Sequence, residues 1–343
     1  MNSIFNESTW NKYLRGYTIH DCAIFREHGF FLVLIEEKEN RDLLPRTRLL
    51  SVMYDKPITV GSLPMVEVGD FNFCTVVRGT SPAEYVAVDT RSNVYSGSAQ
   101  RNNTERAIDE VIDMRTHQNG VGVVRKMVRA AGQVFALGSY RKIYRRIGVE
   151  QWIELGSEGK GVPMPPDIET RSSYFMSMGF RDMSAFSPDD MYAVGGDGDA
   201  WRFDGKTWHD CRLPTKAPLY TVCCAGDGQV YITELNGSVW AGREGKWTRV
   251  ATSDIAAGFQ PVDSAWFNDR LYLGGQEGVW LIDAEHKTLV PLADTESDAP
   301  NATNSGRLDV TPDGKFLLTA GPYGACLHDG AGWKRLFSAF DFL

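Results

Sequence analysis

The sequence lacks an apolar run long enough to cross a bilayer. Its longest apolar run is FFLVLI, residues 30–35, whereas a membrane helix needs about 20 such residues. The first segment, MNSIFNESTWNKYLRG, also lacks the basic stretch followed by an apolar one that marks a signal peptide. We therefore interpret residues 30–35 as a buried strand, and we expect a cytoplasmic protein with no membrane partner.

The sequence has no excess of basic residues. Lys and Arg number 36 against 44 Asp and Glu, so the formal net charge is −8. This balance argues against direct binding to nucleic acid or to an anionic membrane surface. It favours a soluble surface or a basic partner.

Motifs that carry chemistry are also missing. There is no CxxC, no HxH or HxxxH pair, no GxSxG, no P-loop and no GxGxxG after a strand. The GGDGDA segment at 195–200 falls at a hairpin position, which favours a turn over a phosphate or calcium loop. We expect no catalytic residue, no metal and no cofactor, histidines at turns or on the surface, and reduced core cysteines at Cys22, Cys74, Cys211, Cys223, Cys224 and Cys326.

What the sequence does contain is a repeat. MSAFSPDDMYAVGGDGDAWRFDGKTW (183–208) and VCCAGDGQVYITELNGSVWAGREGKW (222–247) present the same order of apolar runs, turns and tryptophans. Trp201 and Trp240 are 39 positions apart, as are Trp208 and Trp247. This spacing is typical of a four-stranded β-propeller blade.

Counting such units predicts an all-β propeller of seven four-stranded blades, with six as the alternative. The last five units are clear and the first two are inferred. In the sixth unit Leu289 replaces the final tryptophan, and in the seventh Cys326 takes the place of Trp280. We expect the repeat tryptophans to fill the space between adjacent blades: Trp152, Trp201, Trp208, Trp240, Trp247, Trp280 and Trp333.

The turns agree with this architecture, because Asp-Gly and Asn-Gly steps supply the positive φ that tight hairpins require. We divide the chain into an N-terminal arm, 1–16, and a single propeller, 17–343, with a long loop at about 157–174. The arm is either a short helix or a poorly ordered terminus. Residues 104–115 fit either a helix or an irregular outer strand.

Basic residues gather in the third unit, where we expect a solvated outer blade rather than a single patch because alternate strand residues face opposite ways. They are Arg125, Lys126, Arg129, Arg141, Lys142, Arg145 and Arg146.

The segment DMYAVGGDGDAWRFDGKTW (190–208) resembles the blades of bacterial WD40-, YVTN- and BNR-type propellers, in which a glycine turn, an aromatic residue and a terminal DGxxW recur. The resemblance covers about residues 121–337. The chain departs from it, since it has neither the Trp-Asp dipeptide nor the Gly-His of WD40 repeats, and FDGKTW lacks the serine of a sialidase Asp-box. The resemblance therefore implies a fold and leaves the activity open.

In architecture and charge the chain also resembles, more weakly, cytosolic immunity proteins that neutralise bacterial toxins. That resemblance implies one protein partner, such as a basic nuclease toxin, and we expect a monomer or a heterodimer. The alternatives are a general assembly scaffold and a hydrolase or lactonase-like propeller enzyme with its site in the central channel. Acidic loops would meet the partner through Glu36, Glu37, Glu39, Asp167, Glu169, Asp294, Glu296 and Asp298.

Overall fold

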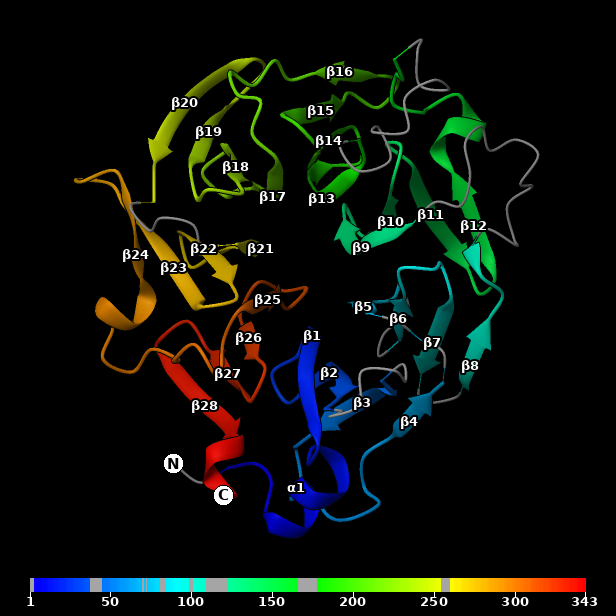
Figure 1. Ribbon diagram of the computed structural model, residues 1–343, viewed down its shortest axis with the longest axis vertical. Coiled ribbons are helices and arrows are strands. Elements are labelled where there is room, and N and C mark those ends of the chain that lie inside the picture. Colours follow the sequence, from blue (N-terminus) through cyan, green and yellow to red (C-terminus); the bar gives the residue numbers. More distant parts are fainter. Residues whose placement is uncertain are drawn as a thin grey trace.

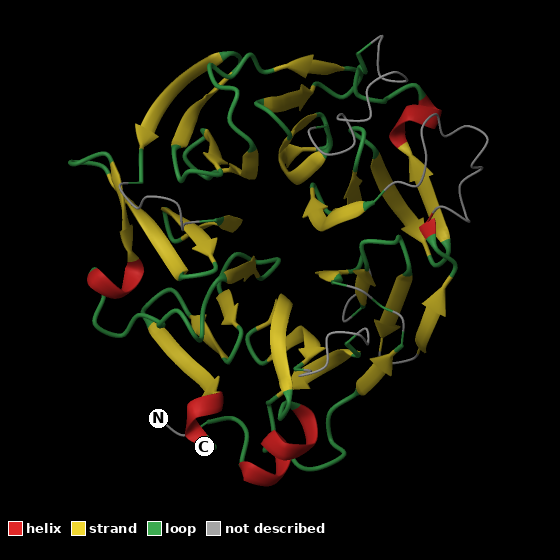
Figure 2. Cartoon of the chain, viewed as in Figure 1, coloured by secondary structure: helices red, strands yellow, loops and turns green. Residues whose placement is uncertain are grey.

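The computed structural model describes residues 3–37, 45–69, 71, 73–80, 84–98, 101–108, 123–165, 178–253 and 260–343. The strands of these residues form seven four-stranded antiparallel sheets, arranged as radial blades around a central channel (Figure 1). Helices are confined to short segments at the rim (Figure 2). The predicted seven-bladed, all-β propeller is confirmed.

Each blade is a continuous stretch of chain whose first strand lies innermost. The first blade comprises β1 (Tyr17–Arg26), β2 (Gly29–Glu36), β3 (Thr47–Met53) and β4 (Met65–Val68). The second comprises β5 (Thr75–Arg78), β6 (Tyr85–Val88), β7 (Val94–Ser98) and β8 (Arg101–Glu105). The third comprises β9 (Val124–Ala130), β10 (Gln133–Gly138), β11 (Ile143–Gly148) and β12 (Gln151–Glu154).

The remaining four blades follow the same plan. The fourth comprises β13 (Phe180–Ser187), β14 (Asp190–Gly195), β15 (Asp199–Phe203) and β16 (Trp208–Asp210). The fifth comprises β17 (Leu219–Cys224), β18 (Val230–Glu234), β19 (Val239–Arg243) and β20 (Lys246–Ala251). The sixth comprises β21 (Pro261–Phe267), β22 (Arg270–Gly275), β23 (Gly278–Asp283) and β24 (Thr288–Pro291), and the seventh β25 (Arg307–Val310), β26 (Leu317–Gly321), β27 (Gly324–His328) and β28 (Trp333–Ser338).

The second strand of each blade carries most of the core. β6, β14 and β26 are buried along their whole length. Neighbouring blades cover both faces of these strands, so they read as continuous apolar runs rather than as alternating ones. The run at 30–35 is such a strand, since it lies within β2.

The repeat tryptophans lie in hydrophobic clusters that join two adjacent blades. Those of the third strands, Trp201, Trp240 and Trp280, contact the preceding blade. Those of the fourth strands pack on the connection that enters their blade. Trp208 Nε1 donates to the Lys160 carbonyl at 3.0 Å, and Trp247 Nε1 donates to the Cys211 carbonyl at 2.8 Å. These contacts stack the blades, which could not bury both faces alone.

Tight turns join the strands as the dipeptides indicated. Among the described residues, the glycine of each Asp-Gly or Asn-Gly step has a φ between +69° and +90°, a region that favours glycine: Gly198, Gly205, Gly228, Gly237, Gly314 and Gly330.

The ring closes without exchanging a strand between the first and last blades. Instead, helix α1 (Glu7–Tyr13) lies beside both, close to the two termini (Figure 1). Asn6 caps this helix by accepting a hydrogen bond from the Thr9 N–H, which stabilises its first turn. The arm therefore contains a short helix, as one of the two alternatives for it predicted, and is not a poorly ordered terminus over residues 3–16.

Two expected features fall partly outside the described residues. The segment 104–115 begins within β8 and is helical at Ile108, but its residues from 109 onward lie outside them. The loop at 157–174 begins in a 3₁₀ turn, Leu155–Glu158, and its residues from 166 onward also lie outside them. No helix among the described residues is both long and apolar enough to cross a membrane.

Candidate functional site

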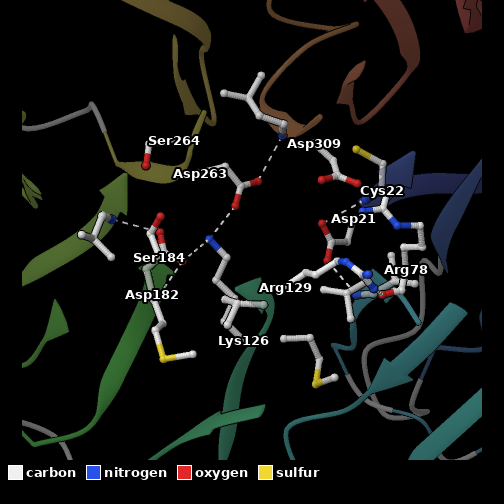
Figure 3. A pocket seen from close by; sticks show the side chains of 17 residues that line it. Asp21, Cys22, Arg78, Lys126, Arg129, Asp182, Ser184, Asp263, Ser264 and Asp309 are labelled. Carbon is white, nitrogen blue, oxygen red and sulfur yellow. Dashed lines mark hydrogen bonds and ion pairs between the residues drawn. The ribbon is translucent and has the colours of Figure 1, made fainter. Parts of the chain in front are cut away.

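Charged side chains line the central channel at one level of the inner strands. In β1, β9, β13 and β21 a register shift leaves one residue bulged, and the residue after it points into the channel (Figure 3). These channel residues are Asp21, Lys126, Asp182 and Asp263. Bulges of this kind re-aim a side chain without ending the strand.

The channel carboxylates connect neighbouring blades. Asp21 accepts a hydrogen bond from the Val76 N–H of the second blade at 2.8 Å. Asp182 does the same with Val222 of the fifth blade at 3.0 Å. A buried N–H on an inner strand otherwise needs a partner, so each carboxylate satisfies a group of the adjacent blade. The same contact joins Asp263 to the Leu308 N–H at 3.2 Å, and Asp309 to the Ile24 N–H at 2.7 Å.

Lys126 crosses the channel. Its Nζ lies 3.0 Å from Asp182 Oδ1 and 2.7 Å from Asp263 Oδ1, and it donates to the Val262 carbonyl at 3.2 Å. These three acceptors match the three donors of an ammonium group. Burial opposes the charge, but the two carboxylates outweigh it and raise the pKa of Lys126 above its usual value. Lys126 thus ties the third blade to the fourth and sixth.

Burial raises the pKa of three carboxyls of the channel, Asp309, Asp21 and Asp182, above the usual value. Burial raises the pKa of Asp309 to about 7, against the opposing effects of the Ile24 N–H and Arg78. Burial likewise raises the pKa of Asp21 to about 6. Since the unfolded chain would ionise near 3.8, folding favours the protonated form of both groups.

We expect Asp309→Asn to flatten the pH dependence of stability above about pH 4. The contribution of Asp309 is complete below 3.8, its unfolded value, and is lost as the pH rises through about 7. Denaturant unfolding at about pH 5 and about pH 8 should therefore show a larger loss of unfolding free energy in the wild type than in the variant. The exposed Asp313, whose pKa is lowered by its Thr311 hydrogen bond, provides the control, because Asp313→Asn should not alter this window. Equal slopes for wild type and Asp309→Asn would contradict the assignment.

The channel favours a structural role over catalysis. Its four carboxylates all accept hydrogen bonds from backbone N–H groups, and Lys126 has three acceptors. The pocket measures about 170 Å³, below the roughly 300–1,000 Å³ typical of small-molecule sites. Within the described residues, no group of three or more His, Cys, Asp or Glu is placed to hold a metal ion.

The acidic residues expected to meet a partner do not share one surface. Glu36 ends β2 and pairs with Arg46 at 2.7 Å, whereas Glu296 pairs with Arg270, the first residue of β22, at 2.6 Å. Because β2 and β22 are equivalent second strands, these contacts lie at opposite ends of the blades. Glu37 and Asp294 are exposed near Glu36 and Glu296 respectively, and Glu39, Asp167 and Glu169 lie outside the described residues.

Part of this acidic set also has a structural partner. Glu296 accepts a hydrogen bond from Trp333 Nε1 at 3.0 Å, and Asp298 accepts one from the Trp333 N–H at 3.1 Å. These two carboxylates hold the loop after β24 against the seventh blade. The role of the acidic set in partner binding stays a prediction.

The expectation that the basic residues of the third blade are solvated is wrong for several of them. Lys126 lies in the channel, Lys142 is buried, and Arg146 is buried against Glu105 with its side chain 2 % exposed. Arg141 pairs with Asp199 at 2.7 Å. Carboxylates from other blades neutralise Lys126, Arg141 and Arg146, which the acid-free sequence around them does not reveal.

The cysteines are mostly buried, whereas the histidines differ in exposure. All six cysteines are free, and all except Cys224 are buried. The expectation that histidines lie at turns or on the surface is wrong for His328, which is buried in β27 with its ring 4.9 Å from that of Trp333. Burial lowers the pKa of His328.

Comparison with known proteins gives one relative of named function. The chain is 29% identical over 188 residues to the immune protein Tsi7 of Pseudomonas aeruginosa, covering 55% of this chain and 56% of Tsi7. The match thus spans about half of the length of that relative. No protein-family profile matches the chain.

Solved propellers are similar in fold. A catalytically inactive virginiamycin B lyase from Staphylococcus aureus with quinupristin has a TM-score of 0.61 at 8% identity, covering 94% of this chain and 95% of that one. YCF48 bound to D1 peptide gives 0.55 at 15% identity, covering 92% and 94%. The WD40 propeller domain of Doa1 gives 0.57 at 10% identity, covering 89% and 90%. At these identities the likeness shows the fold alone.

Sequence reasoning missed the channel aspartates, although a signal for them exists. HDCAIF (20–25), RDMSAF (181–186) and VDSAWF (262–267) share the pattern D-x-[A/S]-x-F in three different blades. Only the structure shows that its aspartate bonds to the next blade.

Proposed function

We propose that this chain is an immunity protein: a binding propeller that associates with one toxin protein and neutralises it by covering the toxin's functional surface. The 29% identity to the immune protein Tsi7 supports this function. The observation that favours binding over catalysis is the central channel, whose carboxylates and lysine are occupied in holding blades together.

Charge supports a basic toxin, such as a nuclease, as the partner. A net charge of −8 attracts a basic surface over long range and accelerates the encounter. Occlusion of a nuclease groove requires only a rigid surface of the right shape, which a stacked ring of blades provides. A general scaffold would instead hold several partners.

Affinity purification of the tagged protein from its own organism tests the proposal. We expect one dominant basic protein at equal stoichiometry, toxic when produced alone and harmless when this chain is produced with it. Raising the salt from about 50 to about 500 mM should slow association about tenfold or more, because steering is screened. Several sub-stoichiometric partners, or a partner whose toxicity persists beside this chain, would contradict the proposal.

A further inference from the structure

A groove of about 470 Å³ runs between the fifth and sixth blades, which stand side by side in the ring (Figure 1). Tyr231 and Trp266 form one wall, with their rings stacked at 6.1 Å and an interplanar angle of 17°. Leu271, Leu281 and Ile282 contribute apolar side chains to the lining. The groove plays no part in the channel described above.

Leu289, which stands where other blades carry a tryptophan, is buried in the same hydrophobic cluster as Leu271 and Ile282 of the groove lining. In the fifth blade, Trp247 pairs with Gly242 and covers it so closely that a Cβ there would lie 2.9 Å from the indole. In the sixth blade the equivalent pair is Leu289 and Ile282. Leucine covers less of the third strand than an indole does, and Leu281 and Ile282 line the groove. The preceding groove, between the fourth and fifth blades, is lined mainly by polar and charged residues.

The rim of the groove is basic although the chain is acidic. Arg249, Arg270 and Lys287 line it, against the single carboxylate of Asp269. Arg270 is paired with Glu296, whereas Arg249 and Lys287 are exposed and form no ion pair within the described part of the chain. Such a rim attracts carboxylates, and a wall of stacked rings suits a further aromatic ring.

We propose that this groove is the anchor site for the partner: it takes an aromatic side chain of the toxin that is flanked by acidic residues. The inference rests on the proposed function for the identity of the partner. The overall negative charge governs the encounter with a basic toxin, while the groove acts at contact range. Buried aromatic anchors of this kind supply most of the affinity in many interfaces.

Two variants test the groove, with the purified toxin as probe. Leu289→Trp places beside the groove the indole that other blades carry at this position. In the fourth blade the equivalent cross-strand pair is Phe203 and Trp208, whose rings lie 5.2 Å apart, so a tryptophan can stand opposite a bulky residue here. Arg249→Glu with Lys287→Glu reverses the exposed rim. We expect each to weaken toxin binding about tenfold or more, and the reversal of the exposed rim charges to do so with little change in Tm.

Arg212→Glu is the matched control, because this exposed residue lines the groove between the fourth and fifth blades. It should leave toxin binding unchanged. If the wild type binds the toxin and both groove variants bind it equally well, the groove proposal is wrong and the immunity function stands. If the groove variants abolish self-association of this chain and not toxin binding, the occupant is a second copy and the proposal is also wrong.

If no toxin is recovered, the immunity function is contradicted, and the groove is then tested by itself. Peptides are titrated directly into the purified protein for this purpose. The probes are the acetylated, amidated peptides Asp-Phe-Asp and Asp-Ala-Asp, measured by calorimetry. We expect the wild type to bind only the phenylalanine peptide, and Leu289→Trp to bind neither. Equal behaviour of the two peptides would overturn the groove assignment.

Discussion

Replacing Arg146 with methionine is expected to lower the free energy of unfolding by about 3–5 kcal/mol. Both terminal nitrogens of Arg146 lie 2.8 Å from the carboxylate oxygens of Glu105, and both side chains are almost completely buried. Methionine fills a similar volume but leaves the Glu105 charge without its main partner. Urea unfolding at neutral pH measures the loss.

A double variant and a surface pair make this prediction specific. Arg146→Met with Glu105→Gln should recover most of the loss, because it removes the unpaired charge and keeps an acceptor for the Glu150 N–H, which Glu105 binds at 2.7 Å. Arg26→Met breaks an exposed pair with Asp55 and should cost less than about 1 kcal/mol. A double variant as unstable as Arg146→Met alone would show that lost packing, not the buried charge, causes the effect.

The stabilisation from the Arg146–Glu105 pair should depend on pH. Burial alone would raise the pKa of Glu105, but the hydrogen bonds from Arg146 and Ser96 outweigh it and lower the pKa to about 2. This stabilisation is present above 4.5, the unfolded value, and is lost as the pH falls through about 2. Removing Arg146 should therefore weaken the dependence of stability on acid.

Replacing Trp10 with alanine is expected to cost about 3–5 kcal/mol, because it empties a buried site between the last and the first blade. Trp10 is buried, and its ring stacks on Phe342 at 4.8 Å. Three residues further along the helix, the Tyr13 hydroxyl accepts hydrogen bonds from the Gly61 and Leu63 N–H groups of the first blade at 2.7 and 3.1 Å. Helix α1 thus binds the last and the first blade together.

Thermal unfolding and native-state hydrogen exchange check this role. We expect a lower Tm and faster exchange in the first and seventh blades than in the fourth, since the ring opens at the seam. Phe340→Ala, which removes an exposed ring near the same seam, should change the free energy of unfolding by less than about 0.5 kcal/mol. A uniform rise in exchange across all blades would indicate general destabilisation rather than an opened seam.

Much of the fold could be read from Trp201, Trp240 and the Asp-Gly turns, because blade periodicity and hairpin conformation are local properties. The roles of the channel residues could not be predicted in this way. Asp182 resembles any strand residue in the sequence, and its role depends on Val222, which lies 40 positions away. Glu296 looked like a partner-binding residue because the sequence does not reveal that Arg270 and Trp333 surround it.

The sequence by itself determined the turns and the repeated blade, since turn dipeptides and a 39-residue spacing are local features of the chain, and it left the number of blades at seven or six. The structure fixed the number at seven. The tertiary structure decided which charges meet. Lys126 reaches Asp263 and Arg146 reaches Glu105 only because stacking brings separate repeats within about 3 Å. Burial then makes each such pair far more consequential than the same charges in water, and no local pattern specifies that environment.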